Sequence, residues 1–228
     1  MQLEILDQYL AFVFKNPDPF GEKPLQESLT KKGFKVPARP PPGLISVTIG
    51  PPIVAVGKDA RISYDPEVGF LAVNSGTTAK MVEIFRELPS ILETDVLPRW
   101  KDVARGIEFT LMGRVTGDAI PMQVISAFAK PLDMTVFSEI VGVPVTLGTI
   151  RLVPAGLTQG EDNLRRVLQW FELRIEPWIT NPISYLVNVV YRDPSLDKVV
   201  KFAEDSQAFI YKAIETLENS YGQPASNH

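Results

Sequence analysis

The sequence predicts an α+β protein with a curved, mainly antiparallel sheet and helices packed on one face. Three patterns carry this prediction. β-branched runs interrupted by Pro and Gly turns fill residues 44–73, and apolar and charged residues alternate over residues 171–176. A long helical stripe of apolar residues follows Asp193-Pro194-Ser195. Two strand, loop and helix units also favour two pseudo-repeated halves.

The chain has 228 residues, which is enough to bury one good-sized core. We expect an N-terminal helix and a Pro-rich arm over residues 1–43, followed by a single α+β domain over residues 44–222. The possible halves of this domain are residues 44–128 and 129–222. A polar tail over residues 223–228 is expected to be disordered.

The side-chain inventory excludes several kinds of chemistry. The chain has no Cys, and its one His is the last residue, His228. Thiolate and imidazole nucleophiles, bases and metal ligands are therefore not expected, and we predict no cofactor and no metal. The sequence identifies no catalytic residue.

Charge and hydropathy narrow the choice of partners and location. The net charge is −4 and the isoelectric point about 5.2, which makes nucleic acid an unlikely partner. The first residues lack the basic region of a signal peptide, and no apolar run approaches the length of a membrane helix. A cytoplasmic protein with no membrane contact is expected. The 20 Pro and the few Gln and Asn favour a thermophilic source.

The N-terminal 43 residues contain a helical pattern and then a Pro-rich segment. A helix over residues 3–14, ending before Asn16-Pro17, is predicted because apolar residues recur at helical spacing. These residues are Leu3, Leu6, Leu10, Val13 and Phe14. Residues 15–43 are interpreted as an arm. Its Arg39-Pro40-Pro41-Pro42 end favours polyproline II, either as a docking segment or as a stiff spacer.

The remaining elements follow from periodicity and from turn residues. Strands are predicted over residues 45–49, 53–56, 60–64, 69–73, 107–115, 134–140, 149–153, 171–175 and 185–191, the last two as a hairpin. Helices are predicted over residues 78–97 and 122–129, with a capped turn or helix starting at Glu161. A long helix runs from about residue 196 to Gly222.

The face of the predicted strands that points away from the core carries only arginines as cations. Its charged residues are Arg61, Glu108, Arg114, Glu139, Arg151, Glu172, Arg174, Glu176 and Arg192. Arg offers a planar bidentate fork that Lys lacks, so organised pairing is favoured. Three interpretations stay open: an intramolecular ion-pair ladder, a surface for a partner or a second copy, or a platform for an anionic ligand. Trp170 and Trp178 are expected to be exposed on the same side, which favours a contact surface.

These residues supply the candidate sites. The partner-binding candidates are Arg114, Arg151, Trp170, Arg174, Trp178 and Arg192. A possible anion site comprises Ser75, Gly76, Thr77 and Lys80, between a predicted strand and a helix. The alternative for these four residues is a helix cap with a solvated Lys.

The function expected from these patterns is binding. The interpretation is a non-catalytic protein-interaction module that acts through its Arg-lined sheet face, with another protein or a second copy as partner. The alternative is a carboxylate- or Mg²⁺-dependent enzyme acting on an anionic or phosphate-bearing substrate. No carboxylate spacing in the sequence matches a known metal or glycosidase motif.

Overall fold

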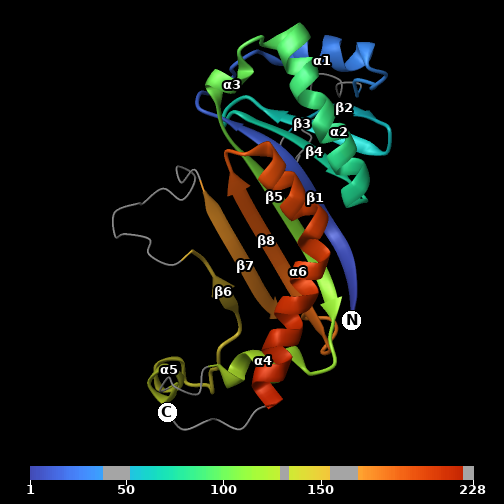
Figure 1. Ribbon diagram of the computed structural model, residues 1–228. Helices are drawn as coiled ribbons and strands as arrows, with labels where there is room; N and C mark the ends of the chain where they lie inside the picture. The colour runs from blue at the N-terminus through green and yellow to red at the C-terminus, as the bar shows by residue number, and fades with distance from the viewer. Residues whose placement is uncertain (38–51, 129–133, 155–168, 223–228) are drawn as a thin grey trace.

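The computed structural model describes residues 1–37, 52–128, 134–154 and 169–222. Its centre is an eight-stranded antiparallel sheet with the order β2-β3-β4-β1-β5-β8-β7-β6. The strands are β1 Gln2–Phe14, β2 Ile53–Gly57, β3 Ala60–Asp65, β4 Phe70–Ser75, β5 Ala104–Thr116, β6 Ile150–Leu152, β7 Trp170–Pro177 and β8 Ser184–Asp193. The predicted α+β class with a curved antiparallel sheet is confirmed (Figure 1). The two pseudo-repeated halves stay a prediction.

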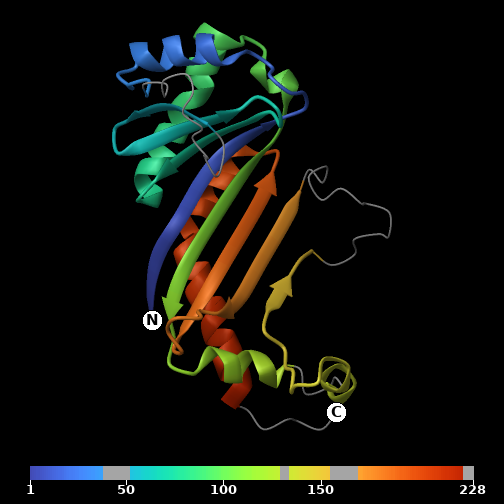
Figure 2. The same ribbon diagram turned by 180° about the vertical axis from the view of Figure 1, so that it is seen from behind.

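The helices lie mainly on one face of the sheet. Their bounds are α1 Glu22–Lys31, α2 Thr78–Ile91, a π-helical turn η1 Leu92–Val96, α3 Trp100–Val103, α4 Pro121–Ala127, α5 Thr135–Val141 and α6 Leu196–Gly222. Helix α2 packs on β1, β3 and β4, whereas α6 packs on β5 and β8. Figure 2 shows the opposite face, where no helix of the described residues crosses the middle of the sheet. We call this the open face; its residues include Tyr9, Arg61, Asn74, Glu108 and Arg192.

Strand β1 corrects the helix predicted over residues 3–14. Ile5 pairs with Gly113 and Asp7 pairs with Met112, so Leu6 is an extra residue in a β-bulge. The bulge shifts the alternation, so that odd-numbered residues such as Leu3 face the helices before it and even-numbered residues such as Leu10 do so after it. This interrupted alternation produced the apparent helical spacing.

The segment after β1 corrects the expectation of a simple arm. Helix α1 buries Leu25 and Leu29 completely, and Phe34 is only 2% exposed. Lys35 and Val56 then form an isolated antiparallel bridge that continues this segment along β2. Apolar burial therefore outweighs the Pro-rich composition here. The expected polyproline stretch over residues 39–42 lies outside the described residues.

Residues 134–140 are also corrected, from a strand to the helix α5. The helix ends at Gly142, whose φ of 75° belongs to the left-handed region that favours glycine. The Ser138 hydroxyl donates to the Met134 carbonyl at 3.0 Å and accepts from the Val145 N–H at 3.1 Å, which stabilises this turn locally. No sheet neighbour among the described residues buries this segment, and Ile140 is 76% exposed. Glu139 therefore does not belong to the sheet face.

The other described elements match their predictions closely, apart from α3, for which no element was predicted. Strands β2 to β8 occur near the predicted positions, and α6 buries Val199, Val200, Ala203, Ile210 and Ile214 on one stripe. Helix α2 begins at a Thr77 cap, contains Pro89 and packs on the sheet as expected. The predicted strand at 45–49, the element from Glu161 and the tail over 223–228 lie outside the described residues. Within the described ranges, no helix has the length and apolarity needed to cross a bilayer.

Candidate functional site

The predicted arginines of the contact surface share the open face. Arg151 of β6 lies directly opposite Arg174 of β7, and Trp170 of β7 lies opposite Arg192 of β8. Arg114 of β5 pairs in register with Leu186. Trp178 follows the end of β7, so it lies in the turn of the hairpin rather than on the strand.

Each of these four arginines has a glutamate partner within the chain. The pairs are Arg114–Glu4, Arg151–Glu172, Arg174–Glu176 and Arg192–Glu108. Arg151 is held by two bonds, from Nε to Glu172 Oε1 at 3.0 Å and from Nη2 to Oε2 at 2.8 Å. The geometry is that of the ion-pair ladder, in which the guanidinium groups are already engaged. The exposed pairs contribute only about 0–1 kcal/mol each to stability.

One of the four pairs is buried at the centre of the open face. Arg192 Nε donates to Glu108 Oε2 at 2.9 Å, and the Tyr9 hydroxyl donates to Glu108 Oε1 at 2.9 Å. Burial, together with the nearby Glu108 carboxylate, raises the pKa of Tyr9. Trp170 is only 6% exposed beside this pair, so the expectation of an exposed Trp at this position is wrong. Burial of this kind suits a structural role better than a contact surface.

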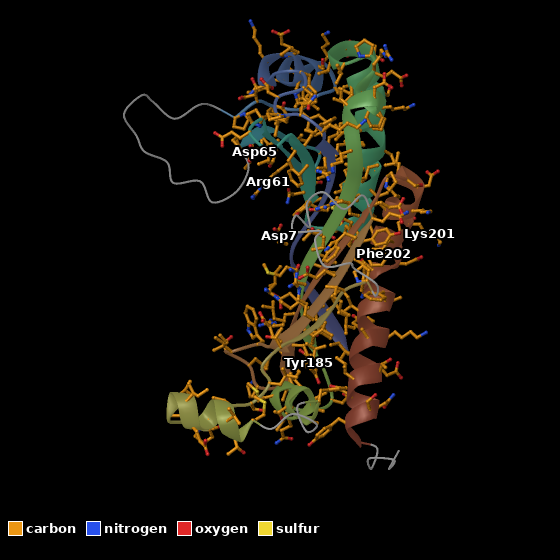
Figure 3. All side chains as sticks on the ribbon, turned by 90° about the vertical axis from the view of Figure 1, so that its left-hand side faces the viewer. Asp7, Arg61, Asp65, Tyr185, Lys201 and Phe202 are labelled. Carbon is orange, nitrogen blue, oxygen red and sulfur yellow. The ribbon has the colours of Figure 1, made fainter. Side chains whose placement is uncertain are left out.

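A groove opens at one end of the open face. It has a volume of about 1160 Å³ and lies where β1, the β2–β3 hairpin, the end of β4 and the start of α2 meet. Its polar lining includes Asp7, Tyr9, Asp59, Arg61, Asn74 and Lys80. Asp7 and Arg61 project from the same side of the sheet (Figure 3).

The predicted anion-binding residues line this groove, but their polar groups are engaged. The Thr77 hydroxyl accepts from the Lys80 N–H at 3.4 Å, and the Ser75 hydroxyl donates to the Asp59 carbonyl at 2.9 Å. Lys80 Nζ lies 2.9 Å from both carboxylate oxygens of Glu83. Gly76 also lines the groove. These contacts are those of a helix cap, as in the alternative interpretation, except that the lysine expected to be solvated is paired with Glu83.

Arg61 differs from the other arginines of the open face. It is exposed, and its guanidinium group has no carboxylate or other hydrogen-bond partner among the described residues. It pairs in register with Asn74, which in turn pairs with Tyr9. The Asn74 amide donates to Asp7 Oδ1 at 3.4 Å and to the Gln8 carbonyl at 3.2 Å. A cation, an amide and a carboxylate therefore follow one another across the groove.

Most of this groove was missed from the sequence. Asp7 and Tyr9 were assigned to a helix, so their place on the sheet could not be foreseen. The alternation of Leu10, Phe12 and Phe14 was the signal that would have revealed the strand. Arg61 was recognised as a face residue, but nothing in its local sequence indicates that its guanidinium has no partner within the described part of the chain.

The lining of the groove can bind a ligand that carries a negatively charged group and a positively charged or hydroxyl group. Arg61 offers donors to an anionic group, and Asp7 accepts from a cationic or hydroxyl group. The described part of the chain contains no group of three or more Asp, Glu or His side chains placed to hold a metal ion. Comparison of the chain with protein-family models, with curated proteins and with solved structures finds no match.

Proposed function

We propose that this chain is a binding module that holds a segment of another protein in the groove of its open face. The observation that carries the proposal is Arg61, the open-face arginine whose guanidinium has no glutamate partner among the described residues. An exposed guanidinium at a groove is suited to bidentate recognition of a carboxylate. An acidic side chain of the partner is the expected ligand of Arg61.

A protein segment suits this groove better than a polyanion does. Asp7 and Asp59 lie in the same groove and would repel a nucleic acid or a polyphosphate. The volume of about 1160 Å³ exceeds the roughly 300–1,000 Å³ typical of small-molecule pockets. A peptide can present one acidic side chain to Arg61 and one basic side chain to Asp7. The alternative of a carboxylate-dependent enzyme stays a prediction.

Self-association is a second candidate, favoured by exposed apolar residues at the other end of the molecule. Ile179 in the β7–β8 turn is 98% exposed, and Ile140 of α5 is 76% exposed. Figure 1 shows α4, α5 and the β7–β8 turn at the lower end. Exposed apolar side chains can contribute to a protein interface when they gather in one patch. The expected contact between copies is then the end of β7 and the following turn, from Arg174 to Trp178, because Trp170 at the start of β7 is buried.

Selection of binding peptides tests the first proposal. A random peptide library displayed on phage is selected against the full chain, and the enriched peptides are synthesised for binding measurements by fluorescence anisotropy. Arg61→Ala should weaken binding about 10-fold or more, since a hydrogen bond to a charged group contributes about 1.5–3 kcal/mol. Arg151→Ala is the matched control, because Arg151 lies on the same face but is paired with Glu172.

The peptides themselves supply the second readout. Replacing their acidic residue by its amide should reproduce the loss caused by Arg61→Ala. Equal binding to Arg61→Ala and to the native chain would show that the groove does not use this arginine, and the proposal would then be wrong.

A further inference from the structure

We propose that the partner segment binds as an added antiparallel strand along the free edge of β1, over residues 2–7. This inference rests on the proposed function and specifies how the groove is filled. The edge is adjacent to the groove, because Ile5, Leu6, Asp7 and Gln8 are among its lining residues.

The edge exists because β1 is longer than its neighbour β4. Strand β1 pairs with β5 over nearly its whole length, from Gln2 to Phe14, whereas its pairing with β4 covers only Tyr9 to Val13. Strand β4 ends at Ser75, and the chain enters α2 at Thr78. On the side away from β5, no described strand therefore accompanies residues 2–8. Figure 2 shows this part of β1 as the margin of the sheet.

The backbone of this edge directs hydrogen-bonding groups outward. The Leu3 N–H donates to the Tyr211 hydroxyl of α6 at 2.9 Å, so it points away from β5. The register is regular from Leu3 to Ile5, and backbone direction alternates along a strand, so the Ile5 N–H also points outward. At the other end, the Gln8 carbonyl accepts from Asn74. The side chains of Tyr211 and Asn74 thus bond to backbone groups at the two ends of the edge. An added strand would bond to the backbone groups between them.

The space beside this edge of β1 extends toward Arg61. An added strand occupies the position that β4 takes further along β1, at the usual spacing of about 4.8 Å between strands. Arg61 lies on β3, the next strand beyond β4, and lines the same groove. A partner side chain on the open face is thus placed between Arg61 and Asp7. Backbone pairing supplies affinity, and this side chain supplies selectivity.

The charges of the edge favour a different protein over a second copy. Glu4 and Asp7 are both exposed, acidic and on the open face, and of the two only Glu4 has an arginine partner, Arg114. Antiparallel pairing of two copies through residues 2–7 would place these carboxylates near those of the other copy, which is unfavourable. A partner segment that alternates apolar residues with charged ones avoids this repulsion. Its apolar side chains would lie beside Leu3 and Ile5, which are half-buried on the helix side.

The test uses the synthetic peptides from the selection and two variants of one residue. Ile5→Pro removes the outward N–H, and proline is tolerated on an edge strand where that group faces away from the ladder. Ile5→Ala is the matched control, because it removes side-chain atoms and keeps the N–H. We expect Ile5→Pro to weaken peptide binding at least 10-fold relative to Ile5→Ala. Circular dichroism and thermal melting establish that both variants fold.

N-methylation of the peptide gives a second measurement on the native chain, which serves even if Ile5→Pro does not fold. Two peptides are compared, one methylated on the odd-numbered amides and one on the even-numbered amides. One of them should lose binding and the other should keep it, since only alternate amides face β1. The added strand would be overturned if the peptide bound equally to Ile5→Pro and Ile5→Ala, or if neither methylated peptide lost binding. The role of Arg61 would stay intact in both cases. Loss at Ile5→Pro without loss at Arg61→Ala would retain the strand and remove the proposed anchor. A dimer in light scattering that Ile5→Pro converts to a monomer would show that a second copy covers the edge, which contradicts the proposed partner.

Discussion

Arg192 and Glu108 face one another across β8 and β5 and form an ion pair whose side chains are only 10% and 9% exposed. They lie on the face of the sheet that the helices leave uncovered, where charged residues are usually solvated. Tyr9 adds a third strand to this contact through its hydrogen bond to Glu108. Three neighbouring strands, β1, β5 and β8, are thus linked by polar side chains on one face and by the apolar core on the other.

Arg192→Met should destabilise the protein by about 3–5 kcal/mol, because it leaves the Glu108 carboxylate buried without its cation. The free energy of unfolding from urea titration measures this effect. Arg151→Met is the control, since Arg151 is 51% exposed and its pair should contribute about 1 kcal/mol or less. Similar losses for the two variants would mean that burial of the Arg192 pair has no energetic consequence.

Alkaline pH should destabilise the fold through three tyrosines, of which Tyr64 and Tyr185 are buried and Tyr9 is half-buried. Burial first, and a neighbouring carboxylate second, raises the pKa of each. An unfolded chain ionises tyrosine near pH 10, whereas the folded chain keeps these protons. The free energy of unfolding is therefore unaffected below about pH 10 and falls as the pH rises above it. The hydroxyl–carboxylate pairs are Tyr9–Glu108, Tyr64–Asp18 and Tyr185–Glu218, at 2.9, 2.8 and 3.0 Å.

Urea unfolding at a series of alkaline pH values measures this dependence, and ultraviolet difference absorbance follows tyrosine ionisation. Tyr64→Phe removes one of the three groups and should make the fall shallower. A stability that is constant up to the pH at which free tyrosine is fully ionised would contradict the raised pKa values.

Ile210→Ala should cost about 2–5 kcal/mol, because the side chain is fully buried between α6 and the sheet. The midpoint of urea denaturation reports the loss. Lys212→Ala, at an exposed position of the same helix, should change stability by no more than about 0.5 kcal/mol. A loss of that small size at Ile210 as well would place its side chain outside the core.

Self-association through the β7–β8 hairpin predicts a mass larger than that of one chain in light scattering. Arg174→Glu would place an acidic side chain between Glu172 and Glu176, so that like charges occupy successive open-face positions of β7. Trp178→Ala would remove apolar contact area. Each variant should shift the chain toward the monomer while keeping its circular dichroism. A native monomer, or two folded variants that stay oligomeric, would show that this hairpin is not the contact between copies, and the ion-pair ladder would then be the better account of its arginines.

Much of the fold followed from local patterns. The alternation of Phe171, Leu173 and Ile175 identified β7, and the stripe that includes Val199 and Ile210 identified α6, because each element buries one regular face. The prediction of a helix over residues 3–14 was wrong for a physical reason. The bulge at Leu6 changes which residues face the core, and a single sequence contains no direct sign of an extra residue in a ladder.

The candidate site was less accessible to sequence reasoning. The choice of Arg over Lys correctly indicated organised pairing. Within the described residues, the arginines of the open face other than Arg61 have glutamate partners. Which arginine has no glutamate partner among the described residues depends on the register between strands that are distant in sequence. Asp7 and Arg61 are 54 positions apart in the printed sequence and become neighbours in one groove only through β4.

The central position of β1 also affects how the chain matures during synthesis. Strand β1 leaves the ribosome first among the described strands, yet its partners β4 and β5 end at Ser75 and Thr116. At about 5–20 residues per second, roughly 5–20 s pass between the completion of β1 and that of β5. During this interval Leu10, Phe12 and Phe14 have no complete sheet to join. The nascent chain therefore exposes an apolar segment that is prone to aggregate. Its folding rate is limited by contacts between residues far apart in sequence.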